Sequence, residues 1–299
     1  MATQAAVIKR KPRGLAAWFK VQNIRHLIQL AFLAFIAFLA IQEVVVGEGG
    51  ATVVASPEAY CPFGGVETLY KLLTTGGATI NHTHLSNVVL LIATLASALI
   101  FRSAFCGWIC PFGTLQEGIM ALSVWLQRRF PQLKKAIKSA QAKAKPGLLA
   151  TLDRWLRYFK YIVLAWIVLA TISAGVMVFR DYDPYATLLK FSELTLGPGL
   201  IILVITLVAS LFVERPWCRY ACPLGAINGI ASQVSPFRLE RNESLCTSCA
   251  ICSKSCPVNL PVATSKKITS PECIGCLKCV DACPRGGALE LKLGLPFGK

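Results

Sequence analysis

The sequence predicts a mainly α-helical membrane protein: a four-helix transmembrane bundle of two parallel two-span repeats, followed by a small α+β domain. Three observations support this prediction. Hydrophobic residues make up 55% of the 299 residues and charged residues only 15%, against about 25% charged residues in a typical soluble domain. Four apolar stretches reach, or nearly reach, the roughly 20 residues that cross a bilayer. Eight of the 13 cysteines fall between Cys246 and Cys283.

The four apolar stretches set the domain organisation. They cover residues 27–46, 86–105, 158–178 and 196–213. We therefore expect a basic N-terminus over residues 1–26, a four-span membrane domain over 27–236 and a tail over 237–299.

Basic residues are distributed unevenly between these stretches, which predicts the topology. Six lie before the first stretch, namely Lys9, Arg10, Lys11, Arg13, Lys20 and Arg25. The segment between the second and third stretches is also rich in Lys and Arg, whereas the loop 47–85 contains only Lys71. Because cytoplasmic loops carry the excess of Lys and Arg, both termini are predicted to be cytoplasmic in a multi-pass protein of a bacterial or archaeal inner membrane. The basic residues that give the chain its net charge of +16 cluster beside apolar spans. This placement indicates contact with the lipid bilayer and no binding of nucleic acid.

The segment 113–156 reads as an amphipathic helix followed by a linker rich in Lys and Ala. A basic amphipathic helix is typical of a segment that lies on anionic lipid. We assign it no chemistry.

The membrane domain contains an internal repeat. Residues 106–114 read CGWICPFGT and residues 218–226 read CRYACPLGA, and each follows a span predicted to run from outside to inside. The outer loops 61–72 and 183–191 are distantly alike. Duplications in membrane proteins tend to place a shared site where the halves meet, so convergence of the two motifs is an expectation.

The tail contains the pattern C-x2-C-x2-C-x3-C-P twice, over residues 246–257 and 273–284. This is the bacterial ferredoxin pattern, in which the fourth cysteine of each run binds the other cluster. Zinc prefers two separated C-x2-C pairs around one ion, and an odd number of cysteines in a chain of this size does not suit a disulfide scaffold. The pattern therefore predicts two [4Fe–4S] clusters. The first cluster site would consist of Cys246, Cys249, Cys252 and Cys283, and the second cluster site of Cys256, Cys273, Cys276 and Cys279.

A shorter pattern, C-x3-C-P, occurs in the repeat. The first motif (106–111) contains Cys106 and Cys110, and the second motif (218–223) contains Cys218 and Cys222. On a helix, thiols four residues apart would share one face, and the prolines that follow suit a chain reversal or a new helix start. The four soft thiols could hold an additional iron, a cluster or copper, act as redox-active dithiols, or be small buried residues.

Other polar residues are weaker candidates. They are Cys61 on the predicted outer face, His26, His82 and His84 beside apolar spans, and the outer carboxylates Glu43, Glu67, Asp181 and Asp183. The carboxylates could accept quinol protons, although interfacial carboxylates are common, and nothing places a second histidine opposite the first as haem would require.

The combination of four spans, duplicated C-x3-C-P motifs and two ferredoxin motifs resembles the NapH/NosR/CcoG-type membrane polyferredoxins, and its size and layout are most similar to the NapH-like members. The resemblance implies electron transfer linked to the quinone pool, with quinone or quinol and ferredoxin-type or cytochrome subunits as partners. It also implies a function for Cys106, Cys110, Cys218 and Cys222.

We therefore expect an electron-transfer subunit, as found in quinol dehydrogenase complexes, with the clusters supplying the redox chemistry. Two alternatives stay open: a copper or iron reductase or assembly factor that uses the C-x3-C-P cysteines, and a redox-sensing regulator.

Overall fold

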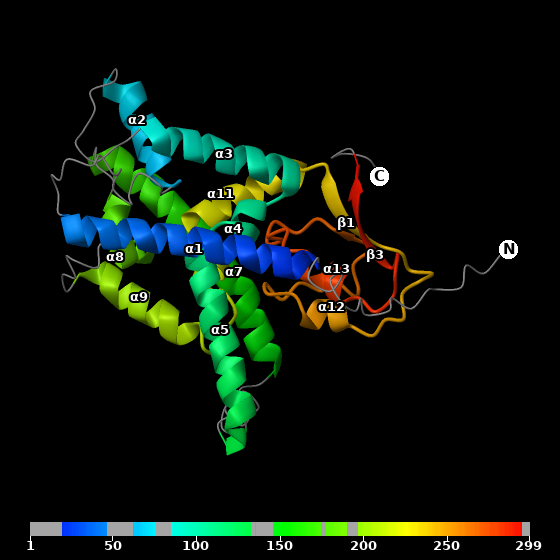
Figure 1. Cartoon of the computed structure of the whole chain (residues 1–299). Coiled ribbons are helices and arrows are strands. Elements are labelled where there is room, and N and C mark those ends of the chain that lie inside the picture. Colours follow the sequence, from blue (N-terminus) through cyan, green and yellow to red (C-terminus); the bar gives the residue numbers. More distant parts are fainter. Residues whose placement is uncertain are drawn as a thin grey trace. The chain divides into compact units, whose positions relative to one another are not determined.

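The computed structural model describes residues 20–46, 62–75, 85–132, 135, 146–174, 178–189 and 197–294. Over these residues the protein is mainly helical, with one small sheet (Figure 1). The described chain forms two compact units. The first unit combines residues within 1–32, 93–110 and 227–299, and the second combines residues within 33–92 and 111–226. Each is considered by itself below.

A helix occupies most of each of the four predicted apolar stretches. These helices are α1 (Val21–Val46), α3 (Leu85–Phe101), α7 (Pro146–Ala174) and α9 (Pro198–Ala209). Two segments, Val21–Gln42 of α1 and Thr151–Ser173 of α7, are long and apolar enough to cross a membrane. The 17 residues of α3 and the 12 residues of α9 correspond to about 25 Å and 18 Å at 1.5 Å per residue, less than the roughly 30 Å hydrocarbon core. The helical fold is thus confirmed, whereas a bundle of four full-length spans is not.

Two of these helices end before the apolar stretches in which they lie, for a local reason. Helix α3 ends at Phe101 because Arg102 takes the left-handed conformation, with φ 62°. Helix α9 ends at Ala209, and the following turn leads to Arg215, with φ 54°. The apolar composition continues past both helix ends, so hydropathy alone overestimated their lengths.

The second unit contains helices in segments expected to be loops. These are α2 (Gly64–Thr75), η3 (Val178–Tyr182) and α8 (Pro184–Leu189). A Cβ on Gly65 would lie 2.3 Å from the Asn87 carbonyl oxygen, so α2 packs against the start of α3 at a distance that only glycine allows. The expected amphipathic helix is present as α5 (Pro111–Arg129).

Helix α5 is anchored to other parts of the second unit. The Ser123 hydroxyl donates to the Leu211 carbonyl over 2.7 Å, and Glu117 forms an ion pair with Arg215 over 2.9 Å. Because Gln116 and Ser123 are buried, one face of α5 packs inside the protein.

The tail forms the small α+β domain that its cysteine spacing predicted. Strands β1 (Phe237–Arg241), β2 (Lys267–Ile268) and β3 (Leu289–Leu293) form an antiparallel sheet in the order β2-β1-β3. Leu239 is paired with Ile268 on one side and Leu291 on the other. Two short helices, α12 (Ile251–Lys254) and α13 (Lys278–Ala282), each follow a cysteine-rich loop.

Candidate metal centres

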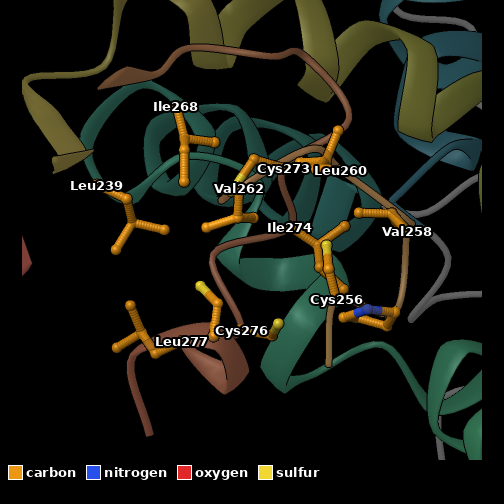
Figure 2. A pocket seen from close by; sticks show the side chains of 12 residues that line it. Leu239, Cys256, Val258, Leu260, Val262, Ile268, Cys273, Ile274, Cys276 and Leu277 are labelled. Atoms are coloured by element: carbon orange, nitrogen blue, oxygen red, sulfur yellow. The ribbon is translucent and has the colours of Figure 1, made fainter. Parts of the chain in front are cut away.

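The four cysteines assigned to the second cluster site line one pocket (Figure 2). The other lining residues are apolar: Leu239, Pro257, Val258, Leu260, Val262, Ile268, Ile274 and Leu277. Cys256 comes from the first ferredoxin motif, and the other three cysteines come from the second. Four thiols in an otherwise apolar pocket suit a [4Fe–4S] cubane, which takes one thiolate at each of four irons. Among the described residues, no three Cys, His, Asp or Glu side chains are grouped to hold a single metal ion.

Both cysteine-rich loops share one backbone conformation. Ser248 and Gly275 each lie two residues after the first cysteine of their motif, and both have a positive φ, of 51° and 59°. Ala250 and Leu277 follow the second cysteine and also have a positive φ, of 57° and 56°. Only one of these four residues is glycine, and the left-handed conformation costs the others roughly 1–2 kcal/mol each. Strain of this kind is characteristic of functional loops, and here it curls each loop around its cysteines.

The first cluster site is more open to solvent than the second. Cys249 is exposed, and Cys246, Cys252 and Cys283 are half-buried. Burial raises the pKa of the Cys252 thiol, and the negative charges of Cys283 and Cys246 add to the rise, so these three thiols lie close together. The Ser248 backbone N–H and the Arg241 side chain lower the pKa of Cys246 by hydrogen bonding to its sulfur.

The second cluster site is shielded. Cys273, Cys276 and Cys279 are each 7% exposed. Burial raises the pKa of Cys276 to about 11 and raises that of Cys279 further. Metal binding would overcome this effect, because a coordinating thiol is deprotonated.

Each C-x3-C-P motif contains a short helix, a turn and a new helix. Cys106 lies in α4 (Ala104–Trp108), and Cys110 lies in the turn before Pro111 starts α5. Cys218 lies in α10 (Pro216–Tyr220), and Cys222 lies in the turn before Pro223 starts α11 (Pro223–Ala231). The expected helix starts at proline are therefore confirmed.

The prediction that each cysteine pair lies on one helical face was wrong. Residues preceding a proline are disfavoured in helical conformation, so each short helix ends before its second cysteine. In both turns the second cysteine's backbone N–H donates to a carbonyl five residues earlier. The distances are 3.0 Å from Cys110 to Phe105 and 2.9 Å from Cys222 to Trp217.

Within the first unit, the first motif packs against the second cluster site. Cys106 contacts the buried core that contains Cys273, Cys276 and Cys279. The Trp108 indole N–H donates to the Gly275 carbonyl over 3.0 Å. A Cβ on Gly107 would lie 2.3 Å from the Ile274 carbonyl oxygen, so this contact is between backbones.

Three polar residues at the start of α1 join the same contact. The Gln22 amide donates to the Cys276 carbonyl over 2.8 Å, and the Arg25 Nε donates to the Gly107 carbonyl over 2.8 Å. Gln29 donates to the same carbonyl over 3.1 Å. Arg25 is fully buried, although its sequence position suggested only a topology signal. Its guanidinium lies close enough to oppose the rise in the pKa of Cys276 that burial causes.

Each motif's first cysteine accepts a hydrogen bond from a buried amide. In the second unit, the Gln116 Nε2 lies 3.5 Å from the Cys218 Sγ. In the first unit, the Asn228 Nδ2 lies 3.7 Å from the Cys106 Sγ. Burial raises the pKa of the Cys218 thiol, whereas the Arg215 guanidinium and the Gln116 amide oppose that rise. Sequence reasoning missed both amides, although each lies five residues after its motif's proline.

The weaker candidates are only partly described. Cys61, His82 and His84 lie outside the described residues, as do the side chains of Glu43 and Glu67. His26 is exposed. Asp183 is buried and accepts a hydrogen bond from the Tyr185 backbone N–H over 3.0 Å, and burial raises its pKa to about 6.

Two protein-family models match the chain. A model described as "4Fe-4S binding domain" matches residues 83–131 and 195–242, each match containing one C-x3-C-P motif. A model described as "4Fe-4S dicluster domain" matches residues 238–284. The first match confirms the internal repeat, and the second covers both ferredoxin motifs. No solved structure matches the chain.

The chain is also similar to several curated proteins. YccM of Escherichia coli, named as a candidate electron transport protein, is 32% identical over 82% of this chain and 67% of YccM. NapH of Escherichia coli, named a ferredoxin-type protein, is 28% identical over 64% of this chain and 63% of NapH. NosR of Pseudomonas aeruginosa, named a regulatory protein, is 29% identical over 64% of this chain and 26% of NosR. With both its repeat and its dicluster segment matched, the chain belongs to the NapH/NosR-type polyferredoxin family.

Proposed function

We propose that this chain is a membrane-bound electron-transfer protein. It holds two [4Fe–4S] clusters on the cytoplasmic side and exchanges electrons with the quinone pool or with a redox partner in or across the membrane. The observation that carries the proposal is the pocket in which Cys256, Cys273, Cys276 and Cys279 come together beside the first C-x3-C-P motif. The two long apolar helices support the membrane location.

Cys246, Cys249, Cys252 and Cys283 would hold the first cluster, and the four pocket cysteines would hold the second. When bound, such clusters supply one-electron redox chemistry at potentials that the surrounding protein adjusts. The second set is supported by the shared pocket and the first by the mutual charge effects on Cys252.

The difference in exposure supports a directional arrangement within the first unit. Cys249 is exposed, which suits the first cluster site to exchange with a soluble partner. The walls of the second cluster site are apolar, and its loop contacts Gly107 and Trp108 of the first motif. Arg25, Gln22 and Gln29 orient that loop and the motif through backbone carbonyls. We therefore assign the first site to solvent exchange and the second to exchange with the membrane domain.

The test is the iron and labile sulfide content of the anaerobically purified full chain, together with its EPR spectrum. Two cubanes predict about eight iron atoms and eight sulfides. In the proposed ligand sets, the fourth cysteine of each ferredoxin motif binds the cluster of the other ferredoxin motif. Cys256→Ser should therefore remove the shielded second cluster and leave the solvent-open first cluster. Cys283→Ser should do the opposite. An external chelator should bleach the remaining cluster rapidly in Cys256→Ser, where it occupies the open first site, and more slowly in Cys283→Ser, where it occupies the shielded second site. A chain without iron, or variants that lose the opposite cluster, would refute the assignment.

A second candidate function is metal reduction or assembly at the C-x3-C-P cysteines. It is favoured by the amide hydrogen bonds to Cys106 and Cys218, because ligand thiolates are commonly supported in this way. Iron or copper beyond the eight cluster irons, lost in Cys106→Ala or Cys218→Ala, would show an additional site. Cys110→Ala and Cys222→Ala, tested in parallel, would show whether the second cysteines belong to it.

A further inference from the structure

The segment that follows α7 in the second unit turns back along that helix. The Tyr182 ring of η3 meets the Trp166 ring of α7 edge to face, with 5.6 Å between the ring centroids. Trp166 precedes the end of α7 at Ala174 by eight residues, which is about 12 Å at 1.5 Å per residue. Part of the predicted outer loop therefore lies beside α7 and not beyond its end.

The second motif lies near the other end of α7. Asp153, early in this helix, forms an ion pair with Arg219 of α10, and the Tyr220 hydroxyl donates to the same carboxylate over 2.7 Å. Trp166 follows Asp153 by 13 residues, about 20 Å along the helix. The second motif and η3 are therefore about 20 Å apart along α7, less than the roughly 30 Å hydrocarbon core.

Helix α9 gives a second measure of this separation. An ideal Cβ on Gly199, in its first turn, would lie 2.8 Å from the Asp181 carbonyl oxygen of η3 and 2.3 Å from the Thr187 hydroxyl of α8. The 12 residues of α9 then cover about 18 Å before the turn that leads to α10. The buried Phe179 ring of η3 stacks on the Trp217 ring of α10, with 6.5 Å between the centroids. One pair of aromatic side chains thus connects η3 to the helix that carries the second motif.

The apolar surface of α7 continues outward past the level of η3. Val168 and Ile172 are four residues apart and share one face of α7, which differs from the face of Trp166. They are 44% and 60% exposed. Exposed apolar side chains on a membrane helix face lipid, so the hydrocarbon extends beyond the level at which Tyr182 meets Trp166.

Asp181 precedes Tyr182 and is exposed at this level. A carboxylate in hydrocarbon is costly, so charged side chains within a membrane face the protein interior or a water-filled space. Irregular backbone at membrane depth is tolerated under the same condition. The exposure of Asp181 therefore requires water, and the predicted outer face is its nearer source.

We infer that η3 and α8 (Val178–Leu189) form a re-entrant segment that contacts outer-face water and admits water-soluble reactants to the vicinity of the second motif. The inference rests on the membrane location in the proposed function and deepens it. A reactant dissolved in lipid would approach the apolar face of α7 instead, so the partner that suits this segment is hydrophilic.

The experiment uses the full chain in lipid nanodiscs. The amino acid p-acetylphenylalanine is introduced at one position at a time and coupled to a hydroxylamine nitroxide, so that the cysteines stay unmodified. EPR power saturation then compares collisions of the label with oxygen, which dissolves in lipid, and with the polar complex Ni(II)EDDA, which stays in water. The clusters are kept oxidised, because reduced clusters are paramagnetic and would relax the label.

Labels at Asp181 and Tyr182 should collide with the nickel complex about tenfold more often than labels at Val168 and Ile172, because polar solutes are excluded from hydrocarbon. Nickel collisions that are equally frequent at Val168 and Ile172 would place this end of α7 outside the membrane and overturn the inference. Oxygen collisions without nickel collisions at Asp181 and Tyr182 would place η3 against lipid and overturn it as well.

A photo-crosslinker supplies an independent readout of the fold in this region. Under light, p-benzoylphenylalanine at Tyr182 should join η3 to the α7 peptide that contains Trp166. At Val168, the matched control on another face of α7, it should form no link to residues 178–189. Loss of the Tyr182 link in protein that keeps both clusters would refute the inference and leave the proposed electron-transfer function intact, whereas a chain without iron would refute that function.

Discussion

Gly107→Ala tests the contact between the first motif and the second cluster site. An ideal Cβ at Gly107 lies 2.3 Å from the Ile274 carbonyl oxygen, 3.4 Å from its carbonyl carbon and 3.6 Å from the Cys276 Cα. All three are backbone atoms of the loop that carries Cys273 and Cys276, so no side chain can move aside. The loop and α4 must separate until the closest distance rises from 2.3 Å to an ordinary contact of 3.4 Å or more.

The magnitude follows from this overlap. Overpacking a close contact costs about 1–3 kcal/mol. Separation would also lengthen the Trp108 hydrogen bond to Gly275, worth about 1 kcal/mol, and the intrinsic preference for alanine in a helix returns roughly 0.5–1 kcal/mol. We therefore expect a net loss of about 1–3 kcal/mol in the docking of the loop.

Hydrogen–deuterium exchange measures this loss locally. The backbone amides of residues 273–279 should exchange about tenfold faster in Gly107→Ala, because each 1.4 kcal/mol changes a local opening equilibrium tenfold. Iron should also leave the second cluster site faster in Gly107→Ala than in the wild type, whereas iron release from the first cluster site should stay unchanged. Gly118→Ala is the matched control, since no atom of the described residues, apart from the backbone of its own helix and its chain neighbours, lies within 4 Å of an ideal Cβ there. If both variants exchange like the wild type, the close approach at Gly107 is not a feature of the protein.

Three further variants test single interactions. Arg25→Gln removes a buried cation beside Cys276 and should lower the midpoint potential of the second cluster by on the order of 50 mV, about 1 kcal/mol for one electron; an unchanged EPR redox titration would contradict this role. Arg102→Ala removes hydrogen bonds to the Ile268 and Ser270 carbonyls and should destabilise strand β2 by about 2 kcal/mol, seen as faster exchange at residues 267–270. Burial raises the pKa of Asp183 to about 6 in the folded protein, so folding favours the protonated carboxyl group. This contribution to stability is fully present below the unfolded pKa of about 3.9 and is lost as pH rises through 6. Asp183→Asn should therefore remove a decline of about 2–3 kcal/mol between pH 4 and 7, measured as thermal stability against pH.

Local sequence signals predicted local structure well. Pro111 and Pro223 start helices α5 and α11 as expected, because proline suits the first helical turn. Helix ends were harder to predict. Nothing in the composition around Arg102 indicates a left-handed residue, yet its φ of 62° ends α3 four residues earlier than the predicted stretch.

The candidate sites were predicted from cysteine spacing, and their surroundings were not. The cysteine spacing predicted that Cys256 of the first ferredoxin motif joins the first three cysteines of the second ferredoxin motif. In the structure these four cysteines line one pocket. Arg25 was overlooked because a basic residue at the edge of an apolar stretch fits the usual topology pattern. Its burial depends on contacts with Gly107, 82 positions away, which a single sequence does not reveal.

The two C-x3-C-P motifs differ at the residue after their first cysteine, and that difference accounts for their different contacts. In the first motif this residue is Gly107, whose missing side chain lets the Ile274 backbone approach. In the second motif it is Arg219, which forms an ion pair with Asp153 of α7, and the adjacent Tyr220 donates to the same carboxylate over 2.7 Å. An arginine at position 107 would require far more space than the alanine that already overlaps. Duplication thus produced two copies of one local fold, and a single position suits one copy to contact with a cluster-bearing loop and the other to anchoring on a helix of its own unit.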